Sequence, residues 1–113
     1  MTNAQYRSIL PFLHRKSARQ KIIIFLIADG YTVPDLLKMQ AKDLRGLCLP
    51  VDIAVLVDEL LEGRKSGSAF VYPTAGAIPY SAFHRLIRET TGKVLGRGKT
   101  MSPQKFRQWV KTQ

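Results

Sequence analysis

Hydrophobic residues recur at three- and four-residue intervals along most of this chain, and that spacing predicts helices. A first helix is expected to begin at Thr2, because Thr2 and Gln5 have the spacing of a capping box. Pro11 is expected to bend or shorten this helix. Its apolar positions are Tyr6, Ile9, Leu10 and Leu13.

A second helix is expected from Ser17, a suitable N-cap, to about Ala28. The run from Ile22 to Ile27 is apolar on every side and rich in β-branched residues, which is also compatible with a buried strand. We favour a central core helix, because the run follows a basic amphipathic start and ends at Asp29-Gly30, a typical helix stop.

Four further helices are expected to form the rest of the core. They begin at Thr32, with Pro34 in the first turn, at Asp52, at Ser81 and at Ser102-Pro103. The helix from Asp52 is expected to end at Gly63. The apolar residues of these helices are Leu36, Leu37 and Met39; Ile53, Leu56, Val57, Leu60 and Leu61; Phe83, Leu86 and Ile87; and Phe106, Trp109 and Val110.

Two short apolar segments ending at proline predict a small β element. They are residues 45–49, closed by Pro50, and residues 69–72, closed by Pro73 and followed by a turn at 74–77. Basic loops are expected at 64–68 and 92–101. The prediction is therefore a mainly α fold with a small β element, in a single domain over residues 1–113.

The composition agrees with one globular domain: 113 residues, 45% hydrophobic and 23% charged. The longest apolar stretch, Ile22 to Ala28, is far shorter than the ~20 residues that cross a bilayer in a helix. Arg7 and Pro11 interrupt any signal-peptide pattern. A single cysteine, Cys48, excludes an internal disulfide, and we expect it buried in the first strand. These features predict a cytoplasmic protein without a membrane partner.

Charge is the most informative property of the sequence about a binding partner, because the net charge is +10 and is unevenly spread. Residues 1–28 hold five basic and no acidic side chains, residues 29–63 hold three basic and seven acidic, and residues 64–113 hold ten basic and only Glu89. Such a chain is expected to have a basic face that attracts polyanions. Nucleic acid is the commonest such partner, although charge alone leaves anionic lipid and acidic proteins open.

A search for catalytic chemistry yields no site. Residues 96–100 are similar to a phosphate-binding loop, but Lys93 stands where the first glycine is needed. His14 and His84 have no second ligand at metal-binding spacing. No acid–base pair emerges, so we expect no enzyme, no catalytic residue, no metal, no cofactor and no small-molecule substrate.

The segment from Ser81 to Glu89 has a distinctive polar face. Ser81, His84, Arg85 and Arg88 are related by three- and four-residue steps, so they project from one side of a helix. These side chains donate to phosphates and to guanine edges, and a major groove admits one such helix. A merely solvated basic face is the alternative, and the surrounding positive charge favours DNA.

The order of segments resembles the catalytic domain of tyrosine recombinases, the phage integrase family, from about Arg19 onward. Residues 22–39 read IIIFLIADGYTVPDLLKM and look like the family's apolar helix followed by its Gly-Leu-Arg-x-Ser-Glu-Leu-Leu segment. Residues 71–73 with 78–88 look like the strand, turn and helix before the last catalytic block. Residues 102–109, SPQKFRQW, are similar to Pro-His-Asp-Leu-Arg-His-Thr. The resemblance implies a trimmed recombinase fold and a groove-binding helix at Ser81 to Glu89.

The departures from the family pattern imply lost catalysis. Thr32 occupies the position of the catalytic arginine and Gln104 that of the histidine, and only Arg107 is retained. The lysine-bearing hairpin is shortened to residues 45–49. Tyr6, Tyr31, Tyr72 and Tyr80 all precede Arg107, and no tyrosine follows it. Covalent phosphoryl transfer needs that nucleophile, and loss of a single charge-stabilising donor typically costs ~10²–10³ in rate.

The sequence therefore predicts a recombinase-like protein that binds double-stranded DNA without cutting it, as a nucleoid-associated regulator or accessory factor of a phage or mobile element. Ser81, His84, Arg85 and Arg88 are expected to meet bases or nearby phosphates. The residues expected on backbone phosphate are Arg15, Lys16, Arg19, Arg97, Lys99, Lys105 and Arg107.

Two other hypotheses remain open. An uncovered C-terminal helix with Phe106, Trp109 and Val110 would form a homodimer or dock a true recombinase; we favour the simpler interpretation that Trp109 completes the core. A trimmed recombinase completed in trans by a partner's tyrosine is the third hypothesis.

Overall fold

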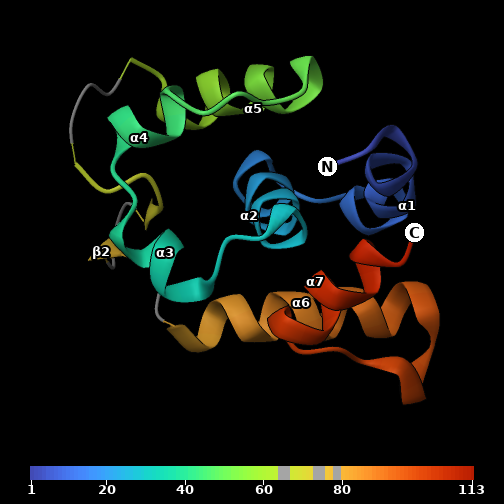
Figure 1. Cartoon of the computed structure of the whole chain (residues 1–113). Helices are drawn as coiled ribbons and strands as arrows, with labels where there is room; N and C mark the ends of the chain where they lie inside the picture. The colour runs from blue at the N-terminus through green and yellow to red at the C-terminus, as the bar shows by residue number, and fades with distance from the viewer. Residues whose placement is uncertain (64–66, 73–75, 78–79) are drawn as a thin grey trace.

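The computed structural model describes residues 1–63, 67–72, 76–77 and 80–113, and shows a mainly helical chain built around one central helix. Helix α2 (Ala18–Asp29) lies in the middle (Figure 1). Helix α5 (Val51–Leu61) packs on one side of it, and helices α6 (Tyr80–Leu95) and α7 (Pro103–Lys111) pack on the other. Helix α1 (Asn3–Leu13) closes one end, and the two termini lie near each other.

Three predicted N-caps are confirmed, each as part of a capping box: Thr2, Ser17 and Thr32. The hydroxyl groups accept hydrogen bonds from the backbone N–H groups of Gln5, Gln20 and Asp35 at 3.1–3.2 Å. Pro11 lies inside α1, which ends soon after it at Leu13.

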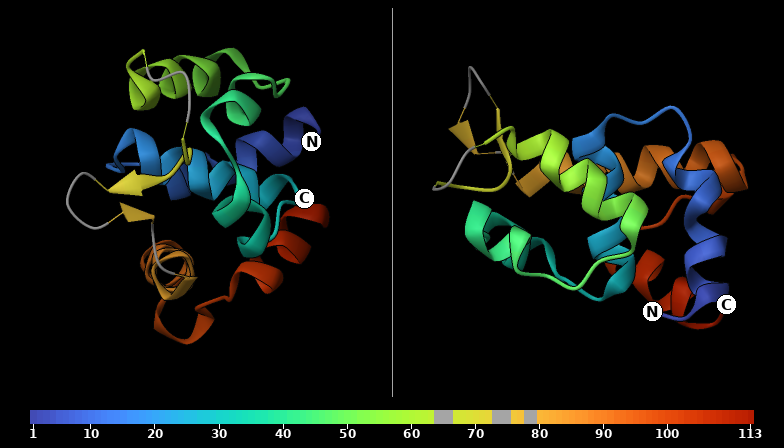
Figure 2. Two further views of the ribbon diagram at one scale, coloured as in Figure 1. Left: turned by 90° about the vertical axis from the view of Figure 1, so that its left-hand side faces the viewer. Right: turned by 90° about the horizontal axis from the view of Figure 1, so that it is seen from above.

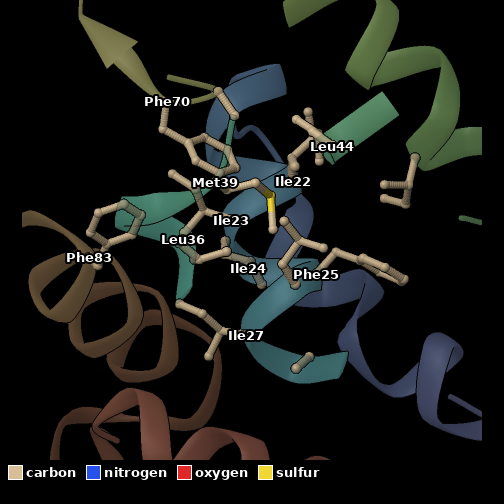
Figure 3. Packing of buried hydrophobic residues seen from close by; sticks show 14 of the residues in the cluster. Ile22, Ile23, Ile24, Phe25, Ile27, Leu36, Met39, Leu44, Phe70 and Phe83 are labelled. Atoms are coloured by element: carbon tan, nitrogen blue, oxygen red, sulfur yellow. The ribbon is translucent and has the colours of Figure 1, made fainter. Parts of the chain in front are cut away.

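The preference for a helix over a strand at Ile22 to Ala28 is confirmed. All seven residues are buried, because α2 has neighbours on every side (Figure 3). The helix ends at Gly30, whose φ of 122° is a conformation that other residues rarely adopt. The all-round hydrophobicity of α2 thus reflects its central position.

Helices α3 (Val33–Lys38) and α4 (Ala41–Arg45) connect α2 to α5. The predicted strand at residues 45–49 is wrong: Arg45 ends α4 and the following residues form no strand. The Gly46 N–H bonds back to the carbonyls of Lys42 and Asp43, which continues the helical turn and removes the extended backbone that a strand needs. Cys48 is exposed, and the prediction of a buried thiol is also wrong.

The β structure of the described residues is smaller than expected. Strands β1 (Val71–Tyr72) and β2 (Gly76–Ala77) pair antiparallel, Val71 with Ala77 and Tyr72 with Gly76. The predicted strand at 69–72 keeps only its last two residues, because the Ala69 N–H bonds to the Met39 carbonyl at 2.9 Å and draws this segment onto α3 and α4. Residues 64–66 of the predicted loop, residues 74–75 of the predicted turn, and Pro73 lie outside the described residues.

Helix α6 is longer than the sequence predicts. It begins at Tyr80, so Ser81 lies in its first turn and does not cap it. It continues through Gly92 to Leu95, so the predicted loop at 92–101 is wrong in its first part, and Arg97–Lys99 form a 3-10 turn, η1. Thr91 closes this end: its hydroxyl donates to the Ile87 carbonyl at 2.8 Å and accepts from the Met101 N–H at 2.9 Å.

Candidate nucleic-acid interface

Four polar positions of α6 lie together along one side of the helix. Ser81, Arg85 and Arg88 are exposed and His84 is half-buried. With Tyr80 and Glu89 they line a shallow hollow of about 560 Å³. The spacing-based expectation of one shared face therefore matches where these side chains lie, because the helix is regular over this segment.

Tyr80 is a surface residue that the sequence analysis missed. Half of its side chain is exposed, and its ring lies against the His84 ring, with centroids 4.6 Å apart. No described residue hydrogen-bonds to the buried His84 Nε2. Tyr80 was missed because the helix was expected to begin one residue later.

Basic residues from the start of the chain extend this surface. Arg19 and Arg85 line one small hollow between α2 and α6. Arg15 and Lys16, in the connection between α1 and α2, line another with Lys93 of α6. Figure 2 shows this connection passing beside the second half of α6. Lys93 was also missed, because Gly92 was interpreted as the start of a loop.

The remaining predicted phosphate contacts are spread over the C-terminal elements. Arg97, Lys99 and Lys105 are exposed on η1 and α7. Arg107 is half-buried, and its Nη2 donates to the Tyr31 carbonyl at 3.0 Å. Arg107 thus ties α7 to the segment before α3, which limits its reach to an outside ligand.

The positions that the recombinase resemblance singles out also meet in space. Thr32, Gln104 and Arg107 line one hollow of about 340 Å³, together with Tyr80 and His84. Among its described lining residues, Arg107 is the one arginine or lysine. The Arg107 guanidinium lies near Asp35, whose pKa is lowered mainly by its hydrogen bonds with Thr32.

Charge is segregated across α2. Among the described residues, no carboxylate lies within ion-pair distance of Arg15, Lys16, Arg85, Arg88 or Lys93. The exposed carboxylates of α5 and its C-terminal end lie on the far side of α2: Asp52, Asp58, Glu59 and Glu62. Burial and the nearby Asp52 carboxylate raise the pKa of Tyr6. The unpaired cations make the described residues of the α6 side predominantly positive.

The apolar side chains of the C-terminal helix pack against the core, and Trp109 among them is half-buried. Phe106 and Val110 are buried. The Trp109 ring packs against Phe12 and Phe106, with centroids 5.5 and 6.3 Å away. Trp109 therefore completes the core with α1, which confirms the simpler of the two interpretations.

Other types of site find no support in the described residues. No three histidine, cysteine or acidic side chains come close enough to share a metal ion. In the same part of the chain, every helix is too short or too polar to span a bilayer. Compared with protein-family models, curated proteins and solved structures, the chain has no match.

Proposed function

We propose that this protein binds double-stranded DNA by placing α6 in the major groove, and that it does so without cutting the strand. One observation carries the proposal: Arg85 and Arg88 are exposed, unpaired among the described residues, and share a helix face with Ser81. Arginine pairs bidentately with the guanine edge, and each good pair contributes ~1–3 kcal/mol of discrimination. A recombinase-like regulator or accessory factor of a phage or mobile element, acting on the nucleoid, is the role that we infer.

Basic side chains on one flank of α6 support this arrangement. Arg15, Lys16 and Arg19 lie on one side of α6, so they would face the strand that borders the groove. Each neutralised phosphate releases counterions, and binding is therefore expected to weaken steeply with salt. The far side of α2 is acidic and would turn away from the duplex.

The absence of strand cleavage is inferred from the substituted positions. Thr32 and Gln104 supply no positive charge to the hollow around Arg107. Tyr80 lines the same hollow, so its hydroxyl is the nucleophile to test if a covalent adduct forms. Docking of a partner through α7 is less favoured, since its apolar side chains pack against α1 and α2.

The test is a fluorescence-anisotropy titration with random duplex DNA at two salt concentrations. Arg88→Ala is compared with Lys42→Ala, which removes an exposed cation from α4, beside the acidic helix. We expect salt-sensitive binding that only Arg88→Ala weakens, and a larger loss on a selected site than on random DNA. Equal losses on both duplexes would mean that Arg88 contacts only phosphate.

Two results would contradict the proposal. Absence of salt-sensitive binding would remove DNA as the partner. A protein–DNA adduct that survives denaturing electrophoresis, and disappears in Tyr80→Phe, would replace simple binding by strand cleavage.

A further inference from the structure

The second half of α6 forms one wall of a separate basic hollow. We name it the Thr90 hollow; its volume is about 370 Å³, at the small end of the range for ligand sites. His14, Arg15 and Lys16 line it from the α1–α2 connection, and Thr90 and Lys93 line it from α6. Among the described residues that line it, none is acidic.

Thr90 is the unusual member of this group. Its side chain is 2% exposed, and its hydroxyl oxygen has no hydrogen-bond partner among the described residues. The neighbouring Thr91 hydroxyl, by contrast, bonds to two carbonyls and one N–H group. Buried hydroxyls are normally satisfied, so an unpaired one in a residue that lines the same hollow as three cationic side chains marks a place for an external acceptor.

We propose that the Thr90 hollow binds a phosphate group. Arg15 and Lys93 would neutralise its charge from opposite walls, and a phosphate oxygen would accept a hydrogen bond from the Thr90 hydroxyl. A DNA backbone phosphate and a free phosphate compound present the same chemistry. Binding of a DNA phosphate in this hollow rests on the proposed function, whereas binding of a free phosphate compound does not.

The first arm of the test is calorimetric titration of the full chain with inorganic pyrophosphate. We expect Lys93→Gln and Thr90→Val to weaken binding by about three- to tenfold, and Thr90→Ser to retain it. The matched control Lys42→Gln removes one exposed cation from α4 and should change nothing. Arg88→Gln, from the outer face of α6, should also have little effect.

Thr90→Val has a second diagnostic effect. Valine has nearly the shape of threonine but no hydroxyl, so the substitution removes the free-energy cost of burying a hydroxyl without a hydrogen-bond partner. We therefore expect a higher Tm than the wild type without ligand, together with a smaller Tm increase on addition of pyrophosphate. A lower ligand-free Tm would show that the hydroxyl already has an internal partner and would overturn the proposal.

The second arm measures DNA affinity against salt for the same variants. One outcome identifies the phosphate as that of DNA. In it pyrophosphate does not bind, Lys93→Gln lowers the salt slope of DNA binding by about one, and Thr90→Val also weakens DNA binding. If DNA does not bind while the pyrophosphate pattern holds, the hollow is a free-phosphate site and only the proposed function fails. If Thr90→Val changes neither ligand, or Arg88→Gln weakens pyrophosphate as much as Lys93→Gln, no phosphate site exists there.

Discussion

Helices α5 and α6 pack on opposite sides of α2, and their exposed faces carry opposite charge. The α5 helix buries only aliphatic side chains against the core: Ile53, Val57 and Leu61. The α6 helix buries Phe83 and Ile87 in its first half, but two threonines in its second half. Each helix is placed by the side chains that it buries, and in α6 these include polar ones. The outer faces are free to differ, and only that of α6 is basic.

The largest effect, on the free energy of unfolding, is expected for a substitution in α2, because both α5 and α6 pack against this helix. Ile24 of α2 is fully buried (Figure 3), and Ile24→Ala should lower the free energy of unfolding by about 2–5 kcal/mol. Chemical denaturation measures this change. DNA affinity of the remaining folded protein should be unchanged, since no groove-facing group is removed. A loss below about 1 kcal/mol would mean that the site relaxes without a cavity.

The second prediction separates the two outer faces. The double variant Arg85→Gln and Arg88→Gln should weaken DNA binding by about ten- to a hundredfold and lower the salt slope by about two. The matched double variant Asp58→Asn and Glu59→Gln on α5 should bind at least as well as the wild type. Similar losses in both pairs, measured by anisotropy, would remove the distinction between the faces.

The third prediction concerns acid stability on the α6 and α7 side. Hydrogen bonds with Thr32 lower the pKa of Asp35 in the folded chain. A lowered pKa contributes stability above the unfolded value of about 3.9, and this contribution is lost as the pH falls through the folded value. Thr32→Ala should cost about 0.5–2 kcal/mol at neutral pH through loss of the N-cap. The difference from wild type should shrink below about pH 4, as measured by denaturation across pH. A constant difference would exclude this linkage.

The smallest effect is expected at the one acidic residue of the α6 surface. Glu89 lies in the same hollow as Arg85 and Arg88 without forming an ion pair among the described residues. Glu89→Gln removes a repulsion with phosphate and should strengthen DNA binding by about two- to fivefold at low salt. The gain should vanish at high salt. Weaker binding would place Glu89 against a base amino group.

Local signals in the sequence located the helices well. Capping residues at Thr2, Ser17 and Thr32 act within one turn, so their effect is visible in the sequence itself. The strand predicted before Pro50 failed because hydrogen bonds after α4 continue the helical turn there. Gly92, which the sequence analysis interpreted as the start of a loop, lies inside α6. Thr100 packs closely against it: a Cβ added there would lie 3.0 Å from Thr100 Cγ2.

The candidate surface was only partly predictable from the sequence, because some of its residues come from segments that are far apart along the chain. The spacing of Ser81, Arg85 and Arg88 is a property of one helix and could be derived from the sequence. The meeting of Arg15 with Lys93, and of Tyr80 with Arg107, depends on how distant helices pack. Nothing in the pattern of Thr90 and Thr91 distinguishes the satisfied hydroxyl from the unsatisfied one.

The most direct test is an NMR titration of the isotope-labelled chain with duplex DNA, following each backbone amide. We expect the amide shifts to concentrate on α6 and on the connection between α1 and α2, while those of α5 stay in place. Shifts that are largest on α5, or spread evenly over both sides of α2, would contradict it.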